Sequence, residues 1–312
     1  MRPIASALGS GMSRLPAISL AAVPGRRVRT LEIAREVESR GYEGIFSPSL
    51  GDLMSLSVSL AHVTERVIFG TAIQPIYHRR AADLAAAASY AAEVSGGRFH
   101  LGLGVSHAPA LQRMGMQGGR PLTDIRQYVT DLRAAVGDRA PMPKIVLATL
   151  RKKMLSLAVE IADGAVWANG ARSHMGESLR TVPAERRAAG FFVGNMVPTT
   201  IDDDRKAAAG VNRKTLSSYV ALPNYRNYWK EAGYVEEMDG IEAALGRGDR
   251  DAVPGFMSDR WLSDVTLYGS ASEVREGVEA WHDAGVDTPI LVPSSTSGGQ
   301  LKALEEVFAA FA

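Results

Sequence analysis

The chain has 312 residues, 46% of them hydrophobic, and its 35 Lys and Arg against 34 Asp and Glu leave a formal charge of +1. This hydrophobic fraction supports a sizeable buried core and excludes wholesale disorder, while the near-neutral charge excludes a general attraction to nucleic acid or an anionic membrane. The chain has no cysteine, which excludes disulfides, thiolate nucleophiles, iron–sulfur clusters and cysteine zinc sites.

Residues 1–14 are mildly apolar and are interrupted by Arg14. We expect them to form a disordered extension rather than a signal peptide, because no continuous apolar core precedes a cleavage site. No run of 18 uncharged apolar residues occurs anywhere in the sequence, so no transmembrane helix is predicted. Together these features predict a cytoplasmic protein.

Short apolar runs alternate with longer helical stretches along the chain. Helical spacing of apolar residues predicts helices over 28–40, 52–62, 78–93, 122–136, 150–162, 272–284 and 301–311. Apolar, β-branched runs predict strands over 18–23, 43–47, 66–73, 98–104, 144–149, 164–168, 191–201 and 288–293. Strands that are apolar throughout are covered on both faces, which indicates a parallel sheet. Eight of them favour a closed (β/α)8 TIM barrel over an open doubly wound sheet.

Residues 202–270 break this alternation. They contain an aromatic, polar stretch at 223–229 and a turn-rich stretch at 246–255, and we expect a mainly helical insertion before the last strand. The whole chain, 1–312, is expected to be one barrel domain. Tyr225, Tyr228 and Trp229 alternate with basic residues and could stack on a nucleic-acid base. With a net charge near zero, an aromatic helix face that packs on a neighbour or lines a pocket is the better interpretation.

In a barrel, chemistry sits at the carboxyl ends of the strands. Arg151, Lys152 and Lys153 follow the fifth predicted strand, where a helix is expected to begin. Cations oppose the helix dipole there, and a bound anion would relieve the conflict. The loop 169–172 after the next strand ends similarly in Arg172. The alternative is a set of solvated side chains with no ligand.

The fourth predicted strand ends in Gly104, whose lack of a side chain allows close approach of a planar ligand or simply a tight turn. His107 follows, where a general acid would be useful, although a structural histidine would fit equally. His78 could contact a cofactor or open a helix, and His100 is expected in the core. The spacings for a metal site, a dinucleotide fingerprint, a hydrolase nucleophile elbow and a phosphate loop are all absent from the sequence.

Several motifs in fixed order resemble the luciferase-like monooxygenase superfamily, in the branch of deazaflavin-dependent oxidoreductases. The resemblance runs from about residue 16 to residue 293, and the motifs that carry it are GYEGIF, HVTERVIFGTAIQPIYHR, SGGRFHLGLGVSH, RPLTDIRQYVTDLR, ADGAVWANGAR and LPNYRNYW. The resemblance implies an oxidoreductase that forms a homodimer and transfers a hydride between coenzyme F420 and a small organic substrate. It also implies a non-proline cis peptide at Ala72–Ile73 beneath the cofactor ring.

The resemblance further implies which residues hold the cofactor. Val105, Ser106 and His107 would border the ring or its ribityl chain, with His107 as a proton donor to the substrate. The loops 149–152 and 169–172 would hold the phosphate. The residues expected to bind the cofactor are Ser49, Ala72, Ile73, Val105, Ser106, Thr149, Arg151, Lys152, Asn169, Gly170 and Arg172. Trp167, Met114 or Tyr225 could line an apolar substrate slot.

Two departures from the family pattern keep alternatives open. Pro48 and Ser49 stand where many relatives carry an acidic residue and a histidine, and Arg151-Lys152 stands where relatives often have Gly-Pro. The alternatives are an FMN-dependent monooxygenase, since one fold serves both cofactors, and a relative that binds the cofactor without turnover. An unrelated phosphate-binding barrel is a further alternative. No metal, nucleic-acid or membrane partner is expected.

Overall fold

The structure is a computed structural model that describes residues 14–138 and 140–312. The expected N-terminal extension lies outside the described residues except for Arg14, which forms an ion pair with Glu43.

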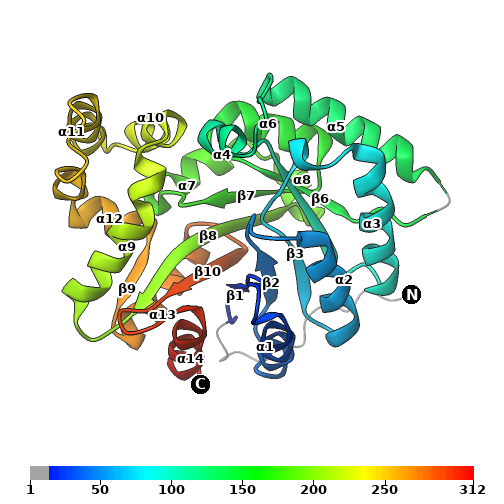
Figure 1. The fold of residues 1–312 in the computed structure, drawn as a ribbon, viewed down its shortest axis with the longest axis horizontal. Coiled ribbons are helices and arrows are strands. Elements are labelled where there is room, and N and C mark those ends of the chain that lie inside the picture. Colours follow the sequence, from blue (N-terminus) through cyan, green and yellow to red (C-terminus); the bar gives the residue numbers. More distant parts are fainter. Residues whose placement is uncertain (1–13, 139) are drawn as a thin grey trace.

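Parallel strands close into a barrel in the order β10-β1-β2-β3-β5-β6-β7-β8, and β10 pairs with β8 from Thr288↔Gly194 to Ser294↔Thr200 (Figure 1). This confirms the predicted TIM barrel. The strands are β1 (Ala17–Ser19), β2 (Gly44–Ser47), β3 (Ile68–Thr71), β5 (Phe99–Gly104), β6 (Lys144–Ala148), β7 (Gly164–Ala168), β8 (Phe192–Ile201) and β10 (Thr288–Ser294).

Two strand predictions need correction. The run 66–73 is not one strand: β3 ends at Thr71, and β4 (Gln74–Pro75) then pairs with the end of β5. The insertion 202–270 is not helical to its end, because β9 (Leu267–Gly269) pairs with the tip of β8 at Thr199–Ile201. Three residues are too few to show a strand period in the sequence.

Helices cover the outside of the barrel as the apolar spacing predicts. They are α1 (Arg27–Ser39), α2 (Leu53–Val63), α3 (Ala81–Val94), α5 (Pro121–Val136), α6 (Lys152–Ile161), α13 (Ala271–Asp283) and α14 (Gln300–Ala310). The helix expected from His78 begins later, at Ala81, after the 3-10 turn η1 (Ile76–His78). Ser270 caps α13 in a capping box with Glu273. The sequence did not predict α4 (Ala108–Arg113), α7 (Arg172–Leu179) and α8 (Ala184–Ala188).

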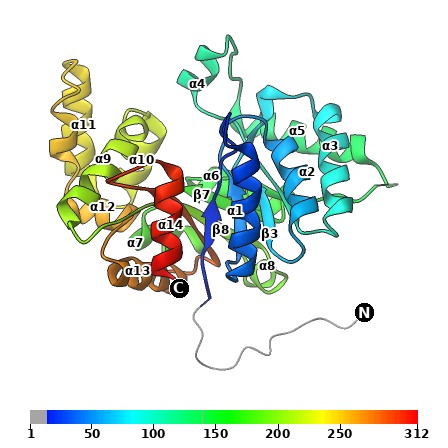
Figure 2. The ribbon, with the colours of Figure 1, turned by 60° about the horizontal axis from the view of Figure 1, so that its bottom comes forward.

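The insertion packs as a lobe with its own core. Its helices are α9 (Arg205–Val220), α10 (Pro223–Glu231), α11 (Val235–Gly246) and α12 (Asp259–Val265), with the 3-10 turn η2 (Val253–Phe256). Trp229 and Trp261 meet edge to face, with ring centroids 4.9 Å apart, and both are fully buried. Figures 1 and 2 show this lobe on one side of the barrel and α2, α3 and α5 on the opposite side, while α4 projects from the body in Figure 2.

Candidate active site at the barrel mouth

The β2–β3 side of the mouth is built around an interruption in the third strand. The peptide bond Ala72–Ile73 is cis, as the resemblance implied. Ser49, in the loop after β2, holds this segment: its Oγ donates to the Ile73 carbonyl oxygen at 2.5 Å, and the Ile73 N–H donates to Oγ at 3.4 Å. The Ala72 N–H donates to the Ser47 carbonyl at 2.7 Å. The segment therefore has a defined place beside β2.

Two glycines of β5 make room for the interruption. A Cβ at Gly102 would lie 1.8 Å from the Thr71 carbonyl oxygen, and one at Gly104 would lie 2.7 Å from Ile73 Cδ1. The close approach that glycine at 104 permits is thus that of a residue of the protein itself, the Ile73 side chain. Any larger residue at these two positions would displace the β3–β4 segment.

A cavity of about 210 Å³ lies beside this segment, lined by Ser49, Gly51, Leu53, Gln74, Pro75, His78 and Met114. No Lys, Arg, Asp or Glu belongs to that lining. Met114 thus lines a cavity, whose lining is polar as well as apolar. Trp167 does not line this cavity: it is 1% exposed and packs in the core between the strands and the outer helices, because alternation along β7 turns it away from the barrel interior.

His107 lies where β5 passes into α4, at the boundary with the insertion. Its ring packs on Tyr225 and Tyr219, with centroid separations of 5.6 and 6.5 Å. Burial lowers the pKa of His107, so the imidazole is neutral near pH 7. Ser106, just before it, has a φ of +63°. The strand end thus turns sharply and presents His107 to the aromatic face of the insertion.

The aromatic stretch of the insertion packs as predicted rather than facing solvent. Tyr225, Tyr228 and Trp229 are at most 5% exposed. The neighbouring cations are paired with acids of α11: Arg226 Nε lies 3.0 Å from Glu242, and Lys230 Nζ lies 2.7 Å from Asp239 and from Glu242. This face of α10 covers the β7 side of the mouth, and Trp229 Nε1 donates to the Asn169 carbonyl at 3.2 Å.

The loop after β7 is closed by the protein's own acceptors. The Gly170 N–H donates to Asn195 Oδ1 at 3.2 Å, and the Ala171 N–H donates to the Tyr228 hydroxyl oxygen at 3.0 Å. Ser173 donates twice to the Asp264 carboxylate, from N–H at 3.0 Å and from Oγ at 2.7 Å. Asp264, on α12, is only 7% exposed. A buried carboxylate therefore already sits at the amino terminus of α7.

The start of α6 is also partly neutralised. The guanidinium of Arg151 forms an ion pair with the Glu231 carboxylate, in which Nε lies 2.9 and 3.1 Å from the two carboxylate oxygens. Both side chains are about half exposed. Lys152 is exposed on the first turn and Arg172 is half-buried on α7. Of the cations predicted to hold a phosphate, Arg151 is thus already paired with a carboxylate of the insertion.

Several polar atoms at the strand ends are buried without a hydrogen-bond partner. They include Ser47 Oγ, Thr149 Oγ1, Asn169 Nδ2 and Asn195 Nδ2. Asn169 also has a φ of +57°. Buried polar groups left without partners are destabilising, and they are typical of sites that a ligand or ordered water completes.

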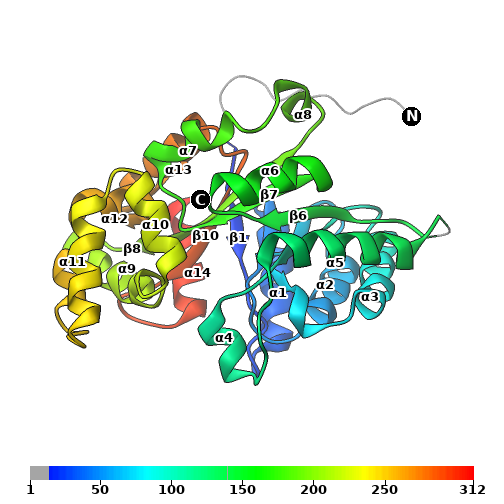
Figure 3. The ribbon, with the colours of Figure 1, turned by 90° about the horizontal axis from the view of Figure 1, so that it is seen from above.

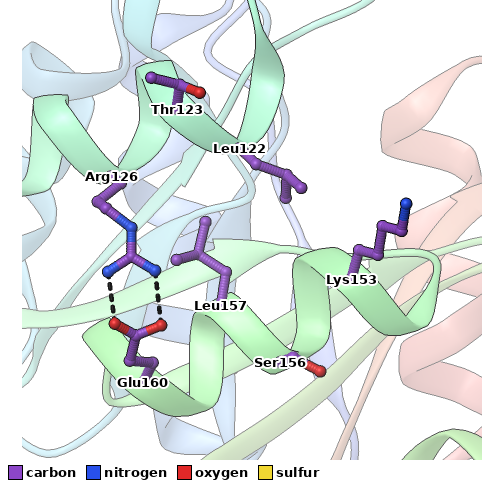
Figure 4. A pocket seen from close by; sticks show the side chains of 7 residues that line it. All are labelled: Leu122, Thr123, Arg126, Lys153, Ser156, Leu157 and Glu160. Carbon is purple, nitrogen blue, oxygen red and sulfur yellow. Dashed lines mark hydrogen bonds and ion pairs between the residues drawn. The ribbon is translucent and has the colours of Figure 1, made fainter.

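Two other candidate features lie away from the mouth. A surface cavity of about 320 Å³ between α5 and α6 is lined by Lys153, Leu157 and the ion pair Arg126–Glu160 (Figure 4). His100 is 6% exposed inside the barrel against Phe46 and Phe192, as expected for a core position. Within residues 14–138 and 140–312, no cluster of three or more potential ligand side chains could hold a metal, and no helix is long and apolar enough to cross a membrane.

Comparison with known proteins matches residues 12–288 to the family model of the luciferase-like monooxygenases. The chain belongs to this family. It is 22% identical over 315 residues to a Mycobacterium tuberculosis protein provisionally named a coenzyme F420-dependent oxidoreductase, covering 85% of this chain and 90% of that one.

Solved structures share the fold. The coenzyme F420-dependent tetrahydromethanopterin reductase of Methanopyrus kandleri superposes with a TM-score of 0.72 at 18% identity, covering 96% of this chain and all of that one. The oxygenating component of 3,6-diketocamphane monooxygenase from Pseudomonas putida, in complex with FMN, superposes with a TM-score of 0.59 at 16% identity over 95% and 98% of the two chains. The fold thus occurs with both cofactors.

The described residues fit the two ends of such a cofactor differently. The β3–β4 segment, held by Ser49 beside the cavity, offers a surface against which a planar ring would pack. In the loop 170–173 the N–H groups of Gly170, Ala171 and Ser173 are paired within the protein, and the acceptor of Ser173 is the Asp264 carboxylate, which disfavours a phosphate at that donor. Sequence reasoning missed Asp264 and Asn195 and did not connect Tyr228 with this loop, because no local motif marks any of them as its partner.

Proposed function

We propose that this protein is an oxidoreductase that transfers a hydride between coenzyme F420 and a small organic substrate. Family membership supports the reaction class, and the observation that carries the proposal is the interrupted strand at Ala72–Ile73, held by Ser49 beside a cavity of about 210 Å³. FMN is the alternative cofactor, since the family fold accommodates it as well.

The roles of the residues follow from where they lie. Ala72 and Ile73 would support one face of the ring, with Ser49 fixing their position and Val105 and Ser106 at its border. Thr149 and Asn169 would offer the polar atoms that lack partners in the protein. When bound, the deazaflavin carries the hydride, and the protein orients it and excludes water.

His107 is the proposed proton donor to the substrate. Its ring is sheltered by Tyr219 and Tyr225, and burial favours its neutral form. In the proposed role the ring first takes up a proton, and the imidazolium then donates this proton to the substrate and returns to the neutral form. The cavity lining of Ser49, Gln74, His78 and Met114 suits an uncharged substrate with one or two hydrogen-bonding groups.

Binding titrations followed by cofactor fluorescence test the proposal directly. We expect F420 to bind more tightly than FMN. Tight binding of FMN with no binding of F420 would make the protein a flavin-dependent monooxygenase instead, and binding of neither would reject a tricyclic cofactor. Tight F420 binding with no hydride exchange to any donor or acceptor would favour the non-catalytic alternative motivated by Pro48-Ser49.

The assembly and location are proposed on the family resemblance alone. We propose a homodimer that works in the cytoplasm. Light scattering coupled to size-exclusion chromatography should give a mass of twice 33.3 kDa. A monomeric mass would reject the dimer.

A further inference from the structure

The loop after β7 resembles an anion-binding site, but acceptor groups of the protein itself take its hydrogen bonds. Asn169, Gly170, Ala171 and Ser173 all direct their N–H groups to acceptors of the protein, respectively the Met196 carbonyl, Asn195, Tyr228 and Asp264. Such a run of N–H groups at a helix start is the arrangement that binds phosphate in other proteins. These four N–H groups are therefore already paired within the protein.

Asp264 supplies the negative charge that an anion would bring. Its two oxygens accept from the backbone and the hydroxyl of Ser173, and it is buried where charge–dipole interactions are strong. Burial, and then the charge of Asp264, raise the pKa of the neighbouring Tyr234 hydroxyl. A phosphate placed here would meet this carboxylate at short range in a poorly solvated site, and like charges repel strongly there.

The insertion also covers the loop physically. Tyr228 is fully buried between the loop and His174, with ring centroids 5.7 Å apart, and Trp229 bonds the Asn169 carbonyl from the same helix. Arg151, the nearest predicted phosphate cation on α6, is paired with Glu231 at the end of α10. Three elements, α6, α7 and the insertion, are therefore joined at this point by hydrogen bonds and an ion pair within the protein. Figure 3 shows α7 beside α10 and α12 in this region.

We infer that the protein recognises its tricyclic cofactor by the ring and ribityl chain and gains no affinity from the phosphate, because Asp264 and Tyr228 already accept the hydrogen bonds that the loop 170–173 would offer it. This rests on the proposed function, because it presupposes that a tricyclic ring binds at the mouth. The ligand is therefore expected to be a flavin or deazaflavin whose affinity for the protein does not depend on its phosphate group.

Paired titrations test the inference: coenzyme F420 against its deazaflavin–ribityl core without phosphate or tail, and FMN against riboflavin, each followed by ligand fluorescence. We expect the two dissociation constants of the pair that binds to agree within about threefold, since charge-assisted bonds to a phosphate would otherwise separate them by orders of magnitude. Binding of the phosphorylated form about 30-fold tighter or more would overturn the inference while leaving the proposed function intact. If no member of either pair binds, the proposed function itself fails, and the inference with it.

Asp264→Ala sharpens the test, because it frees the Ser173 donors and removes the charge. We expect this variant to bind the phosphorylated ligand about tenfold more tightly than the phosphate-free one. Asp259→Ala removes an exposed carboxylate from the same helix and should keep the wild-type ratio. If the ratio of the two dissociation constants is unchanged in a folded Asp264→Ala variant, Asp264 is not what prevents phosphate binding. If that variant does not fold, the wild-type ratio decides alone.

Discussion

The two sides of the barrel mouth use the same fold in opposite ways. On the β2–β3 side, Ser49, Gly102 and Gly104 arrange the chain around an interruption and leave a cavity beside it. On the β6–β7 side, Asp264 accepts from the first turn of α7, and Glu231 pairs with the Arg151 side chain before α6. One side therefore leaves a cavity, whereas on the other side main-chain donors at the start of α7 are paired within the protein. An insertion can thus close one part of a site while the barrel keeps the other part.

Gly102→Ala should have the largest effect, because its Cβ would meet a backbone oxygen that cannot move aside. We expect a loss of about 3 kcal/mol or more in the free energy of unfolding, measured by denaturant titration. Gly210→Ala is the matched control: this glycine is exposed within α9, with nothing within 4 Å of an added Cβ. It should gain about 0.5–1 kcal/mol. Equal effects at both positions would contradict the role of β5 in shaping the open side.

His107→Gln tests the boundary between the two sides. Loss of the proposed proton donor should lower kcat about 100-fold and leave cofactor affinity within about threefold. His174→Gln removes a histidine that packs on Tyr228 on the closed side, and its kcat should stay within about threefold of wild type. Steady-state kinetics with the cofactor that binds would measure both. Comparable losses of kcat in the two variants would contradict a specific role of His107 as the proton donor.

The free energy of unfolding should depend on pH through His100, which lies inside the barrel. Burial, and to a smaller extent the charge of Lys144, lower its pKa from 6.5 to about 4. The unfolded chain therefore takes up a proton in this interval before the folded chain does, and stability present above pH 6.5 is lost as the pH falls to 4. We expect a loss of about 2–3 kcal/mol across that window from this residue.

His100→Leu should flatten that dependence while keeping stability at pH 7, because the neighbours Phe46 and Phe192 are apolar and Nδ1 has no partner. Denaturant titrations at pH 4.5 and 7 would measure the difference. An unchanged slope between these two pH values would refute a neutral, buried imidazole at this position.

Glu231→Gln should have the smallest effect. The Arg151–Glu231 pair is about half exposed, and exposed ion pairs contribute little, so the free energy of unfolding should change by less than about 0.5 kcal/mol. Cofactor affinity should also stay unchanged if Arg151 takes no part in binding. Titration of the variant with F420 measures this, and a marked gain in affinity would show that Glu231 competes for a cation of the cofactor site.

The local features of this molecule could be predicted from sequence, whereas its long-range pairings could not. Sequence patterns predicted the barrel and the buried aromatic face of α10, since each depends on residues close together in the chain. The motif at strand three located the cis peptide bond at Ala72–Ile73. The bonds that close the β7 loop join Ser173 to Asp264 across 91 residues and Ala171 to Tyr228 across 57. No local pattern encodes such partners, so the basic loops could be interpreted as an anion site.

The most direct test of the account is a crystal structure with the bound cofactor. The account predicts the ring in contact with residues 72–73 and Ser49, its phosphate out of hydrogen-bonding reach of residues 170–173, and Asp264 still bound to Ser173. A phosphate hydrogen-bonded to the Gly170–Ser173 N–H groups, with α12 displaced, would contradict it.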